Sequence, residues 1–152
     1  MSIVIVPYDE SYKDSLFDFT DSCFKELGKV FEPSGRHSFY GDIDSYFEVF
    51  YCLLDDGQVK GSVALKRTGD DVAELKCLYL ASELRGKGFG HQLMSKVISA
   101  AASLGYGSIV LDSMSQYQDA IRLYRRMGFE DTDRYNDNPY ADVFMRLELK
   151  GK

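Results

Sequence analysis

The stretch that decides the fold is Arg85-Gly86-Lys87-Gly88-Phe89-Gly90, which lies between two apolar runs of different periodicity. The run before it, Leu75 to Leu80, is typical of a strand, and the run after it, Leu93 to Leu104, repeats apolar residues at helical spacing. Glycine lets backbone N–H groups approach a phosphate closely, and the positive end of a helix dipole favours an anion. The stretch therefore predicts a pyrophosphate site at a helix start, with Arg85 and Lys87 as added cationic partners.

Two common nucleotide-binding motifs do not fit this stretch. The dinucleotide motif G-x-G-x-x-G, counted from Gly86 and Gly88, needs a third glycine where His91 stands. The Walker A motif G-x-x-x-x-G-K-[ST] needs serine or threonine after Lys87, where Gly88 follows, and it lacks its first glycine as well. The pattern that remains is R-x-x-G-x-G, formed by Arg85, Gly88 and Gly90.

This pattern resembles the acetyl-CoA motif of the GNAT superfamily of N-acyltransferases. Upstream, the run from Ala73 to Leu80 looks like the strand that precedes the motif in that family. Downstream, the run from Ala120 to Glu130 is similar to the family's second signature, A-x-x-L-Y-x-x-x-G-F. The resemblance covers residues 72–130 and implies an α+β fold, with a mixed, twisted central sheet and helices on both faces.

Length, charge and cysteine content narrow the class of protein. A chain of 152 residues has the size of one domain, so we expect a single N-acetyltransferase domain over residues 1–152. A net charge of −6 argues against a nucleic-acid partner and is compatible with a cationic amine substrate. Three cysteines without paired spacing and two histidines predict reduced thiols in a cytoplasmic protein without a metal site. No transmembrane run or signal-peptide pattern is present, so we expect no membrane association, and the oligomeric state stays open, a homodimer included.

The periodicity of the remaining chain predicts the order of the elements. We expect strands at residues 2–6, 48–54, 59–66, 71–80, 108–112, 129–135 and 141–149. We expect helices at residues 9–27 and 42–47, after the glycine-rich stretch, and at residues 118–127. This order of strand, helices, three strands, helix, strand, helix and two strands matches the GNAT fold.

The resemblance also implies which residues hold acetyl-CoA. The backbone from Arg85 to Gly90 would bind the pyrophosphate. The extended edge of Leu78, Tyr79 and Leu80, facing residues 109–112 across a gap, would pair with the pantetheine arm. A backbone N–H near Leu78 would then be the oxyanion donor. Ala120 leaves room for the arm, whereas Tyr117 stands where many relatives carry an asparagine that contacts the pantetheine, which puts that contact in doubt.

Acetyl transfer to an amine needs a base and an acid. A lysine-like amine with a pKa near 10.4 is almost entirely protonated at neutral pH, so a carboxylate has to take its proton. Glu74 is the candidate base, because strand alternation predicts Glu74, Lys76, Leu78 and Leu80 on one face and turns Tyr79 to the other. Tyr124, the tyrosine of the second signature, is the candidate acid for the thiolate leaving group.

The acceptor site is the least readable part of the sequence. In this fold it is built by the loop after the first helix and the last hairpin, which are residues 29–46 and 133–142 here. These loops contain Phe31, Arg36, His37, Phe39, Tyr40, Tyr135, Asn138 and Tyr140. Arg36 is a candidate partner for a substrate carboxylate.

Three functions remain open. The first is acetylation of a small-molecule amine or amino acid. The second is acetylation of a protein N-terminus or lysine, and the third is CoA binding without turnover, as a sensor or interaction domain. Retention of both Glu74 and Tyr124 favours an enzyme.

Overall fold

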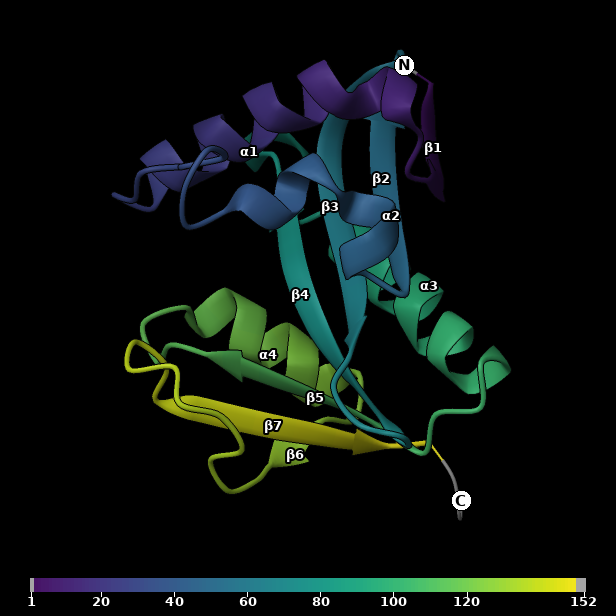
Figure 1. Ribbon diagram of the computed structural model, residues 1–152, viewed down its shortest axis with the longest axis vertical. Coiled ribbons are helices and arrows are strands. Elements are labelled where there is room, and N and C mark those ends of the chain that lie inside the picture. Colours follow the sequence, from purple (N-terminus) through teal and green to yellow (C-terminus); the bar gives the residue numbers. More distant parts are fainter. Residues whose placement is uncertain (1, 150–152) are drawn as a thin grey trace.

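The apolar runs of the sequence become the strands of one twisted sheet (Figure 1). In the computed structural model, which describes residues 2–149, the strand order is β1-β2-β3-β4-β5-β7-β6. The strands are β1 (Ile3–Pro7), β2 (Val49–Asp55), β3 (Gln58–Arg67), β4 (Val72–Leu80), β5 (Ser108–Ser113), β6 (Glu130–Asp131) and β7 (Val143–Glu148). Neighbours pair antiparallel except β4 and β5, which are parallel, so the sheet is mixed.

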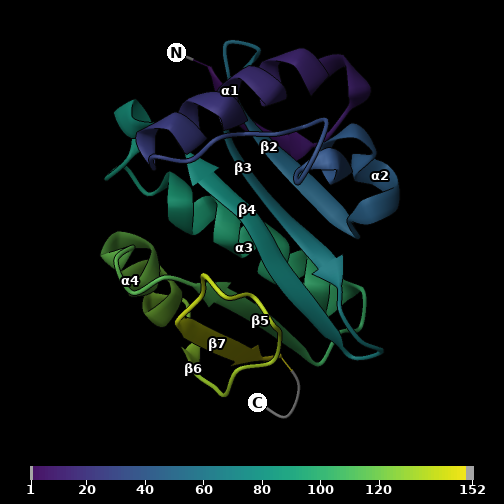
Figure 2. The same cartoon turned by 60° about the vertical axis from the view of Figure 1, so that its left-hand side comes forward.

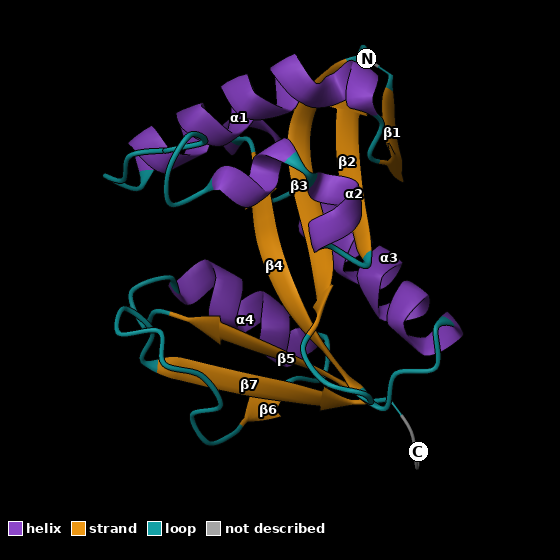
Figure 3. Cartoon of the chain, in the orientation of Figure 1, coloured by secondary structure: helices purple, strands orange, loops and turns teal. Residues whose placement is uncertain are grey.

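Helices cover both faces of this sheet (Figures 2 and 3). The helices are α1 (Lys13–Glu26), α2 (Ile43–Tyr46), α3 (Phe89–Ser103) and α4 (Gln118–Arg126). One apolar cluster lies on the α3 side and includes Leu93, Val97 and Tyr124; a second lies on the α1 and α2 side and includes Leu16 and Ile43. The predicted α+β fold with a mixed central sheet and helices on both faces is confirmed.

Strands β4 and β5 are paired over a short distance only. Val72 to Glu74 pair with Ser108 to Val110, and beyond this point the two strands diverge (Figure 1). The rest of β4 pairs with β3 alone, while β5 continues along β7. The sheet therefore opens between its fourth and fifth strands, directly after Glu74.

A bulge in β4 changes which side chains share a face. The register against β3 shifts between Ser62 and Ala64, and Cys77 has a φ of 60°, which non-glycine residues rarely adopt. The Ser62 hydroxyl donates to the Cys77 carbonyl at 2.7 Å and holds the bulge in place. As a result Leu78 and Leu80 pack on the α3 side, and Tyr79 packs with the cluster on the α1 side.

The predicted alternation along β4 is therefore wrong after the bulge. Glu74 lies directly opposite Lys66, whose ammonium group lies over the Tyr46 ring of α2, so Glu74 faces the α1 and α2 side. Leu78 and Leu80 face the other side, and Tyr79 shares the face of Glu74. The extra residue at the bulge reverses the alternation, as an inserted residue does in any strand.

The predicted strand over residues 129–135 is too long. Only Glu130–Asp131 pairs with β7, and residues 133–142 form a loop. The Arg134 guanidinium donates to the carbonyls of Asn136, Asn138 and Ala141 at 3.0–3.3 Å, and it lies over the Phe144 ring. These contacts curl the loop back over the open end of β5 instead of extending the strand.

Candidate active site

The glycine-rich turn presents free N–H groups at the start of α3. Gly86 and Gly88 have φ values of 76° and 87°, a left-handed conformation that suits glycine, and α3 begins at Phe89. Within residues 2–149, the N–H groups from Gly86 to His91 donate to no backbone or side-chain acceptor. Consecutive free N–H groups at a helix N-terminus form a site for an anion such as a pyrophosphate.

The three glycines contribute to this turn in different ways. A Cβ at Gly86 or Gly88 would meet nothing within 4 Å, so the surface there is open to a ligand. A Cβ at Gly90 would lie 3.1 Å from Leu123 Cδ2 of α4, which is tighter than an ordinary contact. Gly90 therefore lets α3 and α4 approach each other, in addition to its expected role at the phosphates.

Arg85 follows the short 3-10 turn Ser82–Leu84 after β4, and its side chain contacts the protein itself. Its Nε donates to the Leu80 carbonyl at 3.1 Å, and its Nη2 lies 3.0 Å from Glu26 at the end of α1. Its guanidinium thus links β4 to α1 beside the glycine turn. Lys87 is exposed on the turn.

The edge of β4 that faces β5 is free after the strands diverge. The Ala81 N–H donates to the Lys60 carbonyl of β3 at 2.9 Å. Because hydrogen-bonding directions alternate along a strand, the N–H groups of Leu78 and Leu80 point to the opposite edge, toward β5. The residues predicted to pair with pantetheine therefore present an open backbone edge.

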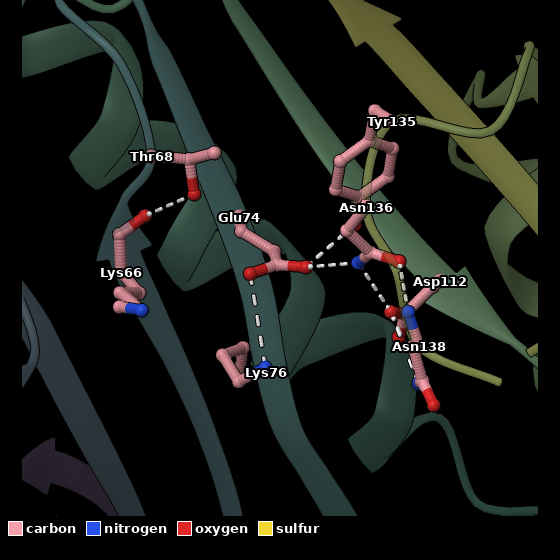
Figure 4. A network of polar contacts seen from close by, with 8 residues as sticks. All are labelled: Lys66, Thr68, Glu74, Lys76, Asp112, Tyr135, Asn136 and Asn138. Carbon is pink, nitrogen blue, oxygen red and sulfur yellow. Dashed lines mark hydrogen bonds and ion pairs between the residues drawn. The ribbon is translucent and has the colours of Figure 1, made fainter. Parts of the chain in front are cut away.

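Glu74 is buried at the point where the sheet opens. Only 7% of its surface is exposed. Its Oε2 accepts hydrogen bonds from the Tyr135 hydroxyl at 2.6 Å and from Asn136 Nδ2 at 3.4 Å (Figure 4). Lys76 Nζ lies 3.7 Å from its other oxygen. Burial, followed by the bond to Glu74, raises the pKa of Tyr135, so this hydroxyl stays a donor.

A second carboxylate joins the same network. Asp112, at the end of β5, accepts from Asn136 Nδ2 at 2.7 Å and from Asn138 Nδ2 at 3.3 Å (Figure 4). One amide group of Asn136 thus bridges Glu74 on β4 to Asp112 on β5. The loop after β6 holds both carboxylates on the two sides of the opening.

Tyr124 faces the same region from α4. It is 7% exposed, and burial, with a further contribution from the Asp112 charge, raises its pKa to about 12. Because Asp112 also contributes to the raised pKa of Tyr135, both hydroxyls lie within its electrostatic range. Asp112 is thus linked to Glu74 through the amide of Asn136, and its charge also acts on the hydroxyl of Tyr124.

The remaining predicted cofactor residues lie at the start of α4. Tyr117 precedes the helix, and its buried hydroxyl has no hydrogen-bond partner among the described residues. Lys29, after α1, places its ammonium group 5.4 Å from the centre of the Tyr117 ring. Ala120 is half-buried one turn later. The unpaired hydroxyl is compatible with a polar ligand next to α4.

Several residues of the predicted acceptor loops serve the fold instead. The Arg36 guanidinium pairs with Glu32 on the surface, and His37 Nδ1 accepts from the Glu32 N–H at 3.0 Å. Burial, with the nearby Arg36 charge, lowers the pKa of His37. Tyr40 is 2% exposed in the core. Of the candidates in these loops, Tyr135 and Asn138 are the ones that reach the carboxylate network.

Three residues of the site were not singled out from the sequence. Asp112 and Asn136 complete the network around Glu74, and Lys66 lies opposite Glu74 in the β3–β4 register. Asp112 could have been found from the sequence, because it is the polar residue that follows an apolar strand-like run. Counting register from a three-residue turn at residues 69–71 would have placed Lys66 opposite Glu74.

The described residues lack two kinds of feature. Among residues 2–149, no three His, Cys, Asp or Glu side chains gather in a way that would hold a metal ion. In the same part of the chain, no helix combines the length and the apolar character needed to cross a bilayer.

Comparisons with known sequences show which proteins this chain resembles. A profile of the acetyltransferase (GNAT) family matches residues 13–129. An uncharacterized N-acetyltransferase of Schizosaccharomyces pombe is 38% identical over 97 residues, which are 62% of this chain and 60% of the relative. The N-acetylaspartate synthetase of Danio rerio is 31% identical over 107 residues, or 66% of this chain and 38% of that protein. The chain thus spans less than two thirds of the length of these relatives.

Solved structures share the fold. A GNAT-family acetyltransferase of Staphylococcus aureus Mu50 superposes with a TM-score of 0.88 and 21% identity, over 98% of this chain and 100% of that one. The Salmonella typhimurium protein YncA, solved with its cofactor acetyl-CoA, superposes with a TM-score of 0.78 and 21% identity, over 100% and 96% of the two chains.

Proposed function

The chain belongs to the GNAT family of acetyltransferases, and from that premise we propose that it transfers an acetyl group from acetyl-CoA to a primary amine of a small molecule or amino acid. The observation that carries the proposal is the alignment of three features along one opening. These are the free N–H groups from Gly86 to His91, the free edge of β4 at Leu78 and Leu80, and the buried carboxylate of Glu74.

The turn and the strand edge would hold the cosubstrate. The N–H groups of the turn bind the pyrophosphate, and the open surface at Gly86 and Gly88 admits it. The backbone at Leu78 and Leu80 pairs with the amides of the pantetheine arm, as one strand pairs with another. The Leu78 N–H then donates to the thioester oxygen as negative charge develops on it, an interaction worth a few kcal/mol in comparable sites.

Glu74 and Tyr124 would move the protons. The ammonium group of the substrate gives a proton to Glu74, directly or through a water, and the neutral amine attacks the thioester carbon. The carbon–sulfur bond then breaks, and Tyr124 donates its proton to the departing thiolate, so that CoA leaves as the free thiol. The second proton that the amine nitrogen loses on becoming an amide returns to Tyr124, and Glu74 releases its proton to water. With a pKa of about 12, Tyr124 carries this proton at neutral pH, and the Tyr135 and Asn136 donors hold Glu74 in place.

The relative named N-acetylaspartate synthetase supports a small amine as the acceptor. A protein N-terminus or a lysine remains the second acceptor class for this chemistry.

Two measurements test the proposal. Calorimetry with CoA should give saturable heat, and acetyl-CoA mixed with a panel of amines and peptides should release free thiol at a rate that depends on one of the acceptors. If CoA binds while no acceptor stimulates release, the chain is a CoA-binding module and the enzymatic proposal is wrong. If CoA does not bind, the site itself is misassigned.

A further inference from the structure

We propose, on the basis of the acetyltransfer function above, that the acceptor amine also carries a carboxylate, that is, a free amino acid, and that Lys66 and Lys76 bind this carboxylate. The proposal names the substrate class of the same site, and it starts from two cations beside the candidate base.

The two lysines flank Glu74 on one face of the sheet. Lys66 of β3 is the register partner of Glu74 of β4, and Lys76 follows two residues later, before the bulge at Cys77. Residues opposite each other or two apart on one face are neighbours in an antiparallel pair, within reach of long side chains. Figure 4 shows Lys66, Glu74 and Lys76 side by side on the two strands.

The ammonium group of Lys66 contacts an aromatic ring rather than a carboxylate. Its ammonium group lies 4.7 Å from the centre of the Tyr46 ring and, among residues 2–149, forms no ion pair. Lys66 is half-buried, so its ammonium group is partly withdrawn from water. A partly desolvated cation that contacts an aromatic ring and lacks a carboxylate is complementary to an anionic ligand.

The nearby carboxylates are engaged by other donors. Glu74 accepts from Tyr135 and Asn136, and its contact with Lys76 is long, at 3.7 Å. Asp112 accepts from two asparagine amides. Lys76 is therefore only loosely held, and Lys66 and Lys76 can both turn to a ligand without leaving a protein carboxylate unpaired.

The spacing suits a small zwitterion. Adjacent strands lie about 4.8 Å apart and alternate residues about 7 Å apart, so one molecule can present its amine to Glu74 and its carboxylate to the lysines. A peptide N-terminus would place a neutral carbonyl where the carboxylate of a free amino acid lies. The two cations thus favour the free amino acid over the peptide.

The test compares matched acids and amides on the full chain with acetyl-CoA. Glycine, aspartate and glutamate are paired with glycinamide, asparagine and glutamine. We expect kcat/KM to be about tenfold higher for at least one acid than for its amide. A partly buried ion pair typically changes affinity by about this factor. Lys66→Met should raise KM for that acid by about tenfold and change KM for the amide by less than about twofold.

A matched control and a second measurement guard against a merely structural effect. Lys96 of α3, on the opposite side of the sheet, has its ammonium group 6.0 Å from the centre of the Tyr51 ring. Lys96→Met therefore removes a similar cation–ring contact and should leave KM for the acid and for the amide unchanged. In the unmodified protein, added salt should raise KM for the acid more than for the amide, because it screens the ion pair.

The outcomes separate this inference from the proposed function. Equal turnover of acids and amides, or equal loss of both in Lys66→Met, overturns the carboxylate inference and leaves the acetyltransferase intact. Turnover of peptides with rejection of free amino acids overturns it as well. The absence of turnover with every amine overturns the proposed function and this inference with it.

Discussion

Tyr124 is the residue whose chemical role can be separated most simply from its role in packing. Tyr124→Phe keeps the buried ring and removes only the proton that we assign to the leaving thiolate. We expect kcat to fall by roughly a hundredfold, within the usual range for an acid catalyst, with little change in the affinity for CoA. Steady-state kinetics and calorimetry check this, and an equal loss of rate and CoA affinity would mark Tyr124 as structural.

The role of Glu74 as base is tested by how the fall in kcat/KM of a Glu74 variant depends on pH. Glu74→Gln preserves the shape of the side chain and removes its ability to take a proton, so we expect roughly a hundredfold lower kcat/KM at neutral pH. The deficit should shrink toward the amine pKa of about 10, where the acceptor loses its proton unaided.

The exposed Glu130 of β6 provides the control for this substitution. Glu130→Gln removes the same charge away from the network and should leave the pH–rate profile unchanged. A deficit in Glu74→Gln that is constant across pH would remove Glu74 from the role of base.

At the scale of elements, the junction between α3 and α4 depends on Gly90. In Gly90→Val, the new Cβ would lie only 3.1 Å from Leu123 Cδ2, so either the Leu123 side chain or α3 has to move, and the added methyl groups crowd the first turn of α3 beside the free N–H groups. We expect a loss of about 1–3 kcal/mol of stability and a clear loss of CoA affinity, against a small loss for Lys87→Ala. Thermal unfolding and calorimetry measure both; a larger effect of Lys87→Ala on CoA binding would show that side-chain charge dominates the site.

The sequence predicted the positions of helices and strands better than it predicted the bulge within β4. Apolar periodicity and the glycine turn placed the helices and most strands. The residues for which the resemblance implies pairing with pantetheine lie on the unpaired edge of β4, and their role in binding stays a prediction. The bulge at Cys77 left no mark in the pattern, because it depends on a hydrogen bond from Ser62 on the neighbouring strand. Reading the strand as regular therefore put Leu78 and Leu80 on the wrong face.

The acceptor side was hard to predict for a related reason. Residues 133–142 look extended at their start, but Arg134 bonds to three carbonyls of its own loop and Tyr135 reaches Glu74, which lies 61 residues earlier. Contacts between such distant residues are invisible to local periodicity. The same reason explains why Asp112 and Asn136 were not singled out.

At the scale of the whole molecule, buried weak acids set a limit on alkaline stability. Burial raises the pKa of Cys23 and Cys77 to about 11 and of Cys52 to about 12. Burial first, then nearby charges, raises the pKa of Tyr8 and Tyr124 to about 12. These folded-state values lie above the unfolded ones of about 8.5 for cysteine and 10 for tyrosine.

The free energy of unfolding should therefore fall at high pH. A group with a raised folded-state pKa stabilises fully below its unfolded pKa, and this contribution is lost as the pH rises through the folded value. We expect nearly constant stability between about pH 7 and 8 and a progressive decline from about pH 9 to 12. Denaturant unfolding across this range checks it, and slow alkylation of the thiols in the native protein at about pH 8 is the companion measurement. A flat profile up to about pH 11 would show that these groups ionise as easily in the folded chain as in the unfolded one.

The early parting of β4 and β5 has a mechanical consequence. In the described part of the chain, β4 and β5 pair through three residue pairs, and these connect the four strands on one side of the sheet to the three on the other. An extended ligand bound between the diverging ends of β4 and β5 would hydrogen-bond along the gap and connect the two parts of the sheet while it is bound. The β4–β5 junction would then become more rigid when the ligand binds and less rigid when it leaves. We expect backbone amide hydrogen exchange in β5 and β7 to be slower while the ligand is bound.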